Sequence, residues 1–211
     1  MDSMIYILFV AVFIPILLMA CLVEKKARQP MIFFLIGMFF SVFASEINAY
    51  LRGILPMSTF EVTTIVTPIS EEILKAFPIL LFATAFTPKK EALFTASMAV
   101  GIGFAVLENA FLLLNGNSFH MLDAIARAFG AGLMHGMCTL LVGVGISFVK
   151  KRQKLFAVGT FALLSTAITY HGIYNMLVQS NFEIIGYLLP ITTYIPFAVW
   201  RIKKKKQAKS G

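Results

Sequence analysis

Long blocks of apolar residues dominate this chain, and each block is about as long as a helix that crosses a membrane. Such a helix needs about 20 apolar residues for a hydrocarbon core about 30 Å thick. The blocks predict seven spans, at about 4–23, 31–51, 62–86, 92–114, 123–149, 155–178 and 184–202. A charged share of only 13% excludes a soluble globular domain. We therefore expect an all-α, polytopic membrane protein that forms one integral membrane domain over residues 1–211.

Basic residues flank these spans unevenly. Fifteen of the 18 lysine and arginine residues lie after the first, third, fifth and seventh spans, the last group leading into a basic tail at 203–211. The opposite loops hold only Arg52, whereas Lys75 and Arg127 lie within spans. By the positive-inside rule, the chain is a multi-pass protein of the cell membrane with its N-terminus outside and its C-terminus in the cytoplasm. The net charge of +8 then reflects topology and contact with anionic lipid, and no nucleic-acid partner is expected.

Ionisable side chains inside the predicted spans gather at similar depths. Such groups are costly in a bilayer and usually mark a functional site. They are Glu46, Glu71, Glu72, Lys75, Glu108, Arg127, His135 and His171. With a helix rise of 1.5 Å per residue, Glu71 and His135 lie roughly 14 to 18 Å from the outer end of their spans, and Glu108 and His171 roughly 10 Å. We therefore expect a polar active-site cavity in the extracytoplasmic half of the membrane.

These residue types favour hydrolysis. A glutamate in a membrane interior suits the role of general base. Glu108, His135 and His171 could hold one zinc ion with an open position for water, or the same kind of set could activate water without a metal. Asn175, one helical turn after His171, could donate a hydrogen bond to a developing oxyanion.

Other embedded residues are interpreted as supporting the site. Lys75 lies four residues after Glu71 and is expected to pair with it, because residues at this spacing share a helix face. Lys75 and Arg127 together are expected to balance the buried carboxylates. Glu46 is interpreted as a structural residue, and Phe104 as a packing or lipid-facing one.

Four short motifs occur in order on four consecutive predicted spans. They are "EEILK" (71–75), "FAVLEN" (104–109), "RAFGAGLMH" (127–135) and "HGIYN" (171–175). In these motifs the chain resembles the PrsW family of intramembrane proteases, which is related to the CAAX prenyl protease (Abi) superfamily. CAAX-type members usually carry histidine at the place of Glu108, so a glutamate followed by an asparagine favours PrsW.

This resemblance implies a peptidase that makes the first, site-1 cut in a single-span, membrane-anchored anti-sigma factor during regulated intramembrane proteolysis. The catalytic positions that it implies are Glu71, Glu72, Glu108, His135 and His171. The supporting positions are Lys75, Asn109, Arg127 and Asn175. The family is classed with metallopeptidases, whereas its relatives are argued to be metal-free glutamate proteases. A zinc-dependent and a metal-free mechanism therefore both stay open.

Two other functions remain as alternatives. Embedded Glu, Lys, Arg and His residues also build proton relays, so the chain could be a proton-coupled transporter. The sequence shows no inverted repeat, which argues against a carrier. A CAAX-type peptidase acting on lipidated or bacteriocin-like peptides is the second alternative, and the glutamate at position 108 argues against it.

Overall fold

The computed structural model describes residues 4–115, 121–148 and 153–210, and within these residues the chain is helical without any strand. The predicted all-α fold is therefore confirmed. The elements are α1 (Met4–Leu22), α2 (Lys25–Ile54), α3 (Thr59–Glu61), the π-helix η1 (Val62–Val66), α4 (Thr67–Ala85), α5 (Lys90–Asn115), α6 (Met121–Ile146), α7 (Gln153–Val178) and α8 (Glu183–Ser210). Part of one predicted basic loop, at 149–152, lies outside the described residues.

The seven long helices match the seven predicted spans, with shifted ends. The basic tail expected at 203–211 is not a separate segment, because α8 continues as one helix to Ser210. Among the described residues, α1, α2, α5, α6 and α7 are long and apolar enough to cross a membrane. The helix α4 carries Glu71, Glu72 and Lys75 and falls outside that group. That α4 and α8 also cross the membrane stays a prediction.

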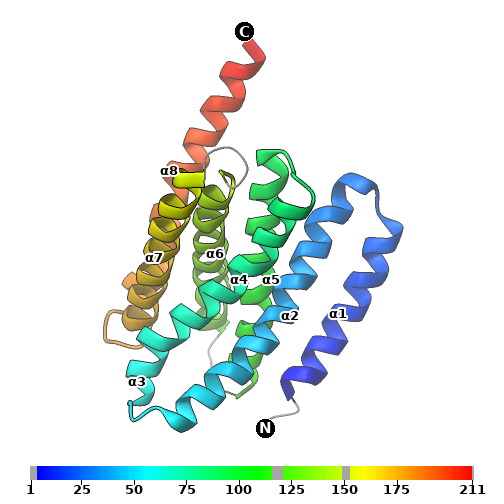
Figure 1. The fold of residues 1–211 in the computed structure, drawn as a ribbon. Helices are drawn as coiled ribbons and strands as arrows, with labels where there is room; N and C mark the ends of the chain where they lie inside the picture. Colours follow the sequence, from blue (N-terminus) through cyan, green and yellow to red (C-terminus); the bar gives the residue numbers. More distant parts are fainter. Residues whose placement is uncertain (1–3, 116–120, 149–152, 211) are drawn as a thin grey trace.

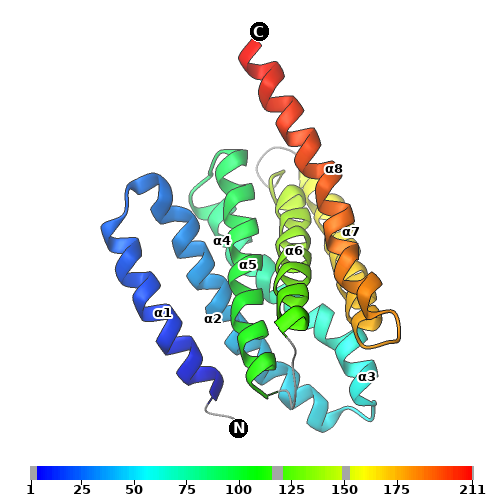
Figure 2. The same cartoon turned by 180° about the vertical axis from the view of Figure 1, so that it is seen from behind.

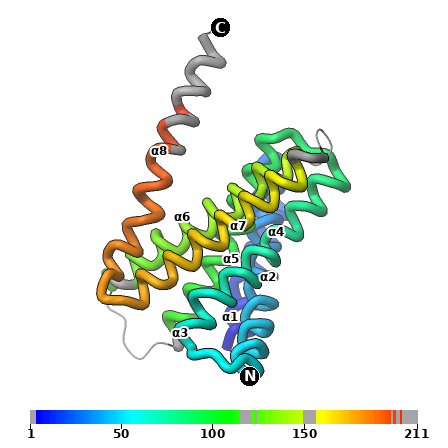
Figure 3. The backbone as a smooth tube through the Cα atoms, turned by 60° about the vertical axis from the view of Figure 1, so that its left-hand side comes forward, coloured from blue at the N-terminus to red at the C-terminus, as the bar shows by residue number. Residues whose placement is uncertain are grey.

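Five helices form a closed ring, in the order α2, α4, α7, α6, α5 and back to α2. The helix α1 lies outside this ring against α2 and α5, and α8 lies outside it against α6 and α7, so the two mark opposite edges of the bundle (Figures 1 and 2). Figure 3 shows α4 and α7 running alongside each other, with α1 behind α2. The N-terminal end of α1 and the C-terminal end of α8 lie at opposite ends of the bundle (Figure 1).

Glycines let α5 approach both of its neighbours closely. A Cβ atom at Gly103 would meet the backbone of Phe34 in α2, and one at Gly101 would meet the backbone carbonyl of His135 in α6. Small residues allow such close helix contacts within membranes. The contact at Gly101 matters for function, because it sets the position of α5 against the backbone of a predicted site residue.

The helix α4 begins through an irregular turn. Ser58 and Glu61 form a capping box, in which the Ser58 hydroxyl accepts a hydrogen bond from the Glu61 backbone N–H and the Glu61 carboxylate accepts one from the Ser58 backbone N–H. A π-helical turn then precedes Pro68 at the start of α4. The wider turn places the two adjacent glutamates of α4 inside the ring, and such π-turns are frequent at functional sites.

Candidate active site

The two adjacent glutamates of α4 point to different partners, because consecutive helix residues lie about 100° apart around the axis. Glu72 is fully buried, and its Oε1 atom accepts hydrogen bonds from Lys75 Nζ at 2.6 Å and from His171 Nδ1 at 2.8 Å. The predicted pairing of Lys75 with Glu71 is therefore wrong. The ammonium group reaches the residue three positions before it, which lies deeper inside the ring.

His135 lies between Lys75 and Glu108. Its Nδ1 atom is 2.7 Å from Lys75 Nζ, and its Nε2 atom is 2.8 Å from Glu108 Oε2. A lysine ammonium group only donates hydrogen bonds, so Nδ1 accepts from Lys75, and Nε2 carries the hydrogen atom of the neutral ring beside the carboxylate of Glu108. The ring of Phe104 lies 5.2 Å from the His135 ring and 4.8 Å from Lys75 Nζ. Phe104 is buried against the polar cluster, and its interpretation as a lipid-facing or simple packing residue is too limited.

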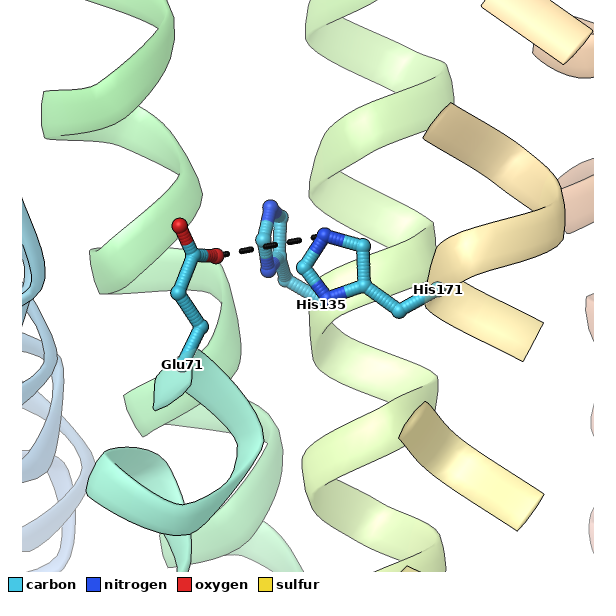
Figure 4. Close-up of side chains that lie close together, drawn as sticks. All are labelled: Glu71, His135 and His171. Atoms are coloured by element: carbon cyan, nitrogen blue, oxygen red, sulfur yellow. Dashed lines mark ion pairs between the residues drawn. The ribbon is translucent and has the colours of Figure 1, made fainter. Parts of the chain in front are cut away.

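Glu71 and His171 face each other across a short gap. Figure 4 shows Glu71 reaching from α4 toward His135 on α6 and His171 on α7. Glu71 Oε1 accepts a hydrogen bond from Asn48 Nδ2 at 3.1 Å, whereas Glu71 Oε2 is buried, has no hydrogen-bond partner and lies 3.9 Å from His171 Nε2. Because Glu72 takes the Nδ1–H of His171, the Nε2 atom of that ring keeps its lone pair toward Glu71.

A cavity of about 560 Å³ reaches this cluster from one end of the bundle. Glu71 and Glu108 line it, together with Arg127 and Asn175. Its wall extends to Arg52, near the C-terminal end of α2. The histidines, Glu72 and Lys75 are not among the lining residues and lie buried behind the two carboxylates that line the cavity. The site therefore has two glutamates that a ligand can touch and a buried polar layer that supports them.

The predicted supporting residues divide into two groups. Arg127 stays near the carboxylates as expected: its Nη2 atom lies 3.9 Å from Glu108 Oε1, and its Nε–H donates to Asn109 Oδ1 at 3.0 Å. Asn175 instead donates its amide N–H to the backbone carbonyl of Thr63 at 2.9 Å. The predicted oxyanion donor thus holds α7 against η1.

Three residues of the network were missed by sequence reasoning or undervalued. Asn48 holds Glu71, and Ser70 in turn donates its hydroxyl to Asn48 Oδ1 at 2.6 Å. Asn48 lies two residues after Glu46, and an amide inside a predicted span was the signal available for it. Phe104 is the third, and its place in the second motif was the signal. Glu46 itself accepts a hydrogen bond from Tyr6 OH at 2.6 Å, away from the cluster.

One group of side chains in the described part of the chain could hold a metal ion. Glu71, His135 and His171 each offer one donor atom, and these atoms lie within 4.8 Å of one another. The sequence placed Glu108 in this set, but the Glu108 carboxylate has ion-pair contacts with His135 at 2.8 Å and Arg127 at 3.9 Å. Glu71 Oε2 and Glu108 Oε2 both lack a hydrogen-bond partner, and Glu71 Oε2 is the freer of the two because its ion-pair contact, to His171 Nε2, is as long as 3.9 Å.

The donor set fits a divalent ion in its chemistry. His171 presents Nε2 while its Nδ1–H is held by Glu72, and a carboxylate behind a histidine is the usual arrangement around zinc. His135 fits less well, because Lys75 occupies its Nδ1 atom and its Nε2 atom then carries the ring hydrogen and lies beside Glu108. We therefore expect Glu71 and His171 to carry most of any metal affinity.

Comparison with known proteins gives one finding. The model of the family described as "PrsW family intramembrane metalloprotease" matches residues 25–201, which is the chain from the start of α2 into α8. No curated protein and no solved structure matches. The match includes every residue of the cluster and leaves α1 outside it.

Proposed function

Since the chain belongs to the PrsW family of intramembrane metalloproteases, we propose that it makes the first, site-1 cut in a single-span anti-sigma factor. Family membership makes the chain an intramembrane protease and disfavours the carrier interpretation. One observation carries the proposed chemistry: Glu71 Oε2 is unpaired, lines the cavity through its side chain and faces His171 Nε2.

In the proposed reaction, a water molecule between Glu71 and His171 attacks the scissile carbonyl carbon. Glu71 accepts a proton from the water as general base, and the new C–O bond forms as the carbonyl oxygen takes up negative charge. Protonated Glu71 then gives its proton to the leaving amide nitrogen as the C–N bond breaks. Asn48 holds the Glu71 carboxylate in place, and Glu72 orients the His171 ring.

Charge near the cavity supports the same reaction. The guanidinium group of Arg127 lines the cavity beside Glu108 and is placed to stabilise a developing oxyanion. Bound at Glu71, His135 and His171, a zinc ion would polarise the carbonyl and activate the water. The nitrogen and oxygen donors of this set favour zinc over magnesium or calcium.

The proposed orientation places the cavity mouth on the extracytoplasmic side. The cavity reaches the end of the bundle that holds the N-terminus of α1, the C-terminal part of α2 and the start of η1. The basic groups that follow the first, third and seventh spans belong to the opposite end. An anti-sigma factor would therefore be cut on its extracytoplasmic side.

The test is co-expression of the chain with candidate single-span membrane proteins, followed by immunoblotting for shortened products. We expect Glu71→Gln and His171→Gln to abolish cleavage while the protein remains in the membrane. Glu91→Gln is the matched control, because Glu91 is an exposed glutamate at the other end of the bundle. Unchanged cleavage in the Glu71 variant would refute the proposed base.

Two further arms separate the remaining alternatives. Loss of cleavage with a chelator, restored by added zinc, supports the metal-dependent route, and full resistance to chelation supports water activation by Glu71 alone. Cleavage restricted to lipidated peptides would replace the anti-sigma factor with a CAAX-type substrate.

A further inference from the structure

The cavity has a side wall that depends on the spacing of α2 and α5. These helices touch backbone to backbone where Gly37 meets Val100 and Gly103 meets Phe34. One turn further along α2, Ser41 lines the cavity. The room that the cavity occupies therefore lies on the site's side of these glycine contacts, with α2 and α5 forming part of its wall.

On the α5 side of this room lie Glu108, Phe111 and Leu112, which also line the cavity. The same space is continuous with Glu71, the proposed base. A chain segment placed between α2 and α5 would thus reach both carboxylates without passing through the buried layer of histidines.

The helix α1 covers this side of the bundle. Ile5 is 3% exposed and lines the cavity, although α1 contacts only α2 and α5 among the helices of the ring. Around it lies an apolar cluster that includes Leu35, Met38 and Val42 of α2 and Leu107 of α5. Ile5 therefore separates the cavity from the surrounding lipid.

The two ends of α1 are held very differently. At its C-terminal end, Arg28 donates hydrogen bonds to the backbone carbonyls of Ala20, Cys21 and Val23, which ties α1 to the start of α2. At its N-terminal end, one exposed hydrogen bond joins Tyr6 OH to Glu46 Oε1 at 2.6 Å. Only 11% of the residues in its apolar window are buried, and the middle of α1 packs against the apolar cluster of α2 and α5 through partly buried side chains such as Phe9 and Val12.

We propose that α1 is a hinged flap over a lateral entry site between α2 and α5, through which the membrane segment of the protein substrate reaches Glu71. A membrane-anchored substrate approaches in the plane of the bilayer, and α1 is the element between the lipid and this face of the cavity. The family match begins at Lys25, the first residue of α2, so α1 lies outside the matched residues. The inference rests on the proposed function for the identity of the segment that enters.

The first test removes the hydrogen bond that holds the flap. Tyr6→Phe keeps the ring and deletes the hydroxyl, and the loss of a hydrogen bond to a carboxylate shifts the closed-to-open equilibrium about tenfold. Tyr50→Phe is the matched control, because Tyr50 is an exposed tyrosine of α2. We expect faster cleavage of a membrane-anchored substrate with Tyr6→Phe only. Equal rates for the parent and both variants would overturn the role of the Tyr6–Glu46 contact.

The second test locks the flap. The variant carries Tyr6→Cys and Glu46→Cys together with Cys21→Ser, and the buried Cys138 is left in place. A reducible bifunctional thiol reagent then cross-links the two new cysteines. We expect cleavage to fall at least tenfold on cross-linking and to recover on reduction. Cleavage at an unchanged rate in the cross-linked protein would overturn the lateral entry site.

A third measurement does not depend on catalysis. A cysteine introduced by Ser45→Cys into the Cys21→Ser protein lies in the cavity wall, and its reaction with a maleimide attached to lipid reports opening toward the bilayer. We expect this reaction to be several-fold faster when Tyr6→Phe is also present, and identical rates would contradict the flap. If no variant cuts any substrate, the proposed function fails, and the labelling rates still decide whether α1 opens.

Discussion

The structure predicts in most detail what happens when Lys75 is replaced. It is fully buried, lies 2.6 Å from Glu72 Oε1 and 2.7 Å from His135 Nδ1, and in Lys75→Met both partners lose their donor. Removing one member of a buried ion pair costs about 3–5 kcal/mol, because the other charge stays buried without compensation. At about 2–4 °C per kcal/mol for a domain of this size, the melting temperature falls by roughly 6–20 °C.

The neutral double variant separates charge compensation from packing. In Glu72→Gln with Lys75→Met the buried charge is removed from both partners, so we expect a smaller loss of stability than in either single variant. Cys138 is fully buried and supplies the assay, because its thiol reacts with a fluorogenic dye only on unfolding once Cys21 is replaced by serine. Lys89→Met at an exposed lysine is the control and should change the free energy of unfolding by less than about 0.5 kcal/mol. A double variant as unstable as the sum of the two single variants would refute the reasoning.

Two further predictions follow from the donor set and from helix packing. His171→Gln and Glu71→Gln should each lower the zinc bound per protein at least tenfold, and His135→Gln should lower it less. The bound zinc is measured by mass spectrometry after dialysis. A larger loss with His135→Gln than with the other two variants would contradict the tautomer assigned to His135. Gly101→Ala should destabilise the protein by about 1–3 kcal/mol, because the new methyl group meets the His135 backbone. Gly132→Ala is the control and should not destabilise the protein, because Gly132 has open space around it. The same thiol assay measures the stability of both variants.

Much of the fold could be predicted from the sequence because the bilayer imposes simple rules. Backbone groups inside lipid must be satisfied within the segment, so each apolar block has to be a helix. The predicted span 92–114 corresponds to α5 at Lys90–Asn115, within two residues at each end. The cost of buried charge likewise pointed to the embedded ionisable residues, and the family resemblance selected Glu71, Glu72, Glu108, His135 and His171 among them, before any contact was known. The orientation of the bundle in the membrane stays a prediction from the basic loops.

Partners within the cluster could not be predicted at the same level. Sequence spacing favoured a pair of Lys75 with Glu71, but the rotation of α4 inside the ring pairs Lys75 with Glu72. Spacing also suggested Asn175 as an oxyanion donor, but one of its two amide N–H groups bonds the backbone of η1. These outcomes depend on how each helix is turned about its axis, and contacts between distant helices set that rotation.

The sequence by itself determined that the chain is a set of membrane helices with acidic and imidazole groups at similar depths, because length, apolar character and residue type are properties of single segments. Only the tertiary structure decided that Glu71 keeps the free oxygen, that Asn48 holds it and that α1 lies outside the catalytic ring against α2 and α5. The physical reason is that a side chain's partner is chosen by the close packing of helices far apart in sequence, such as α5 against His135 at Gly101, and no single segment contains that information.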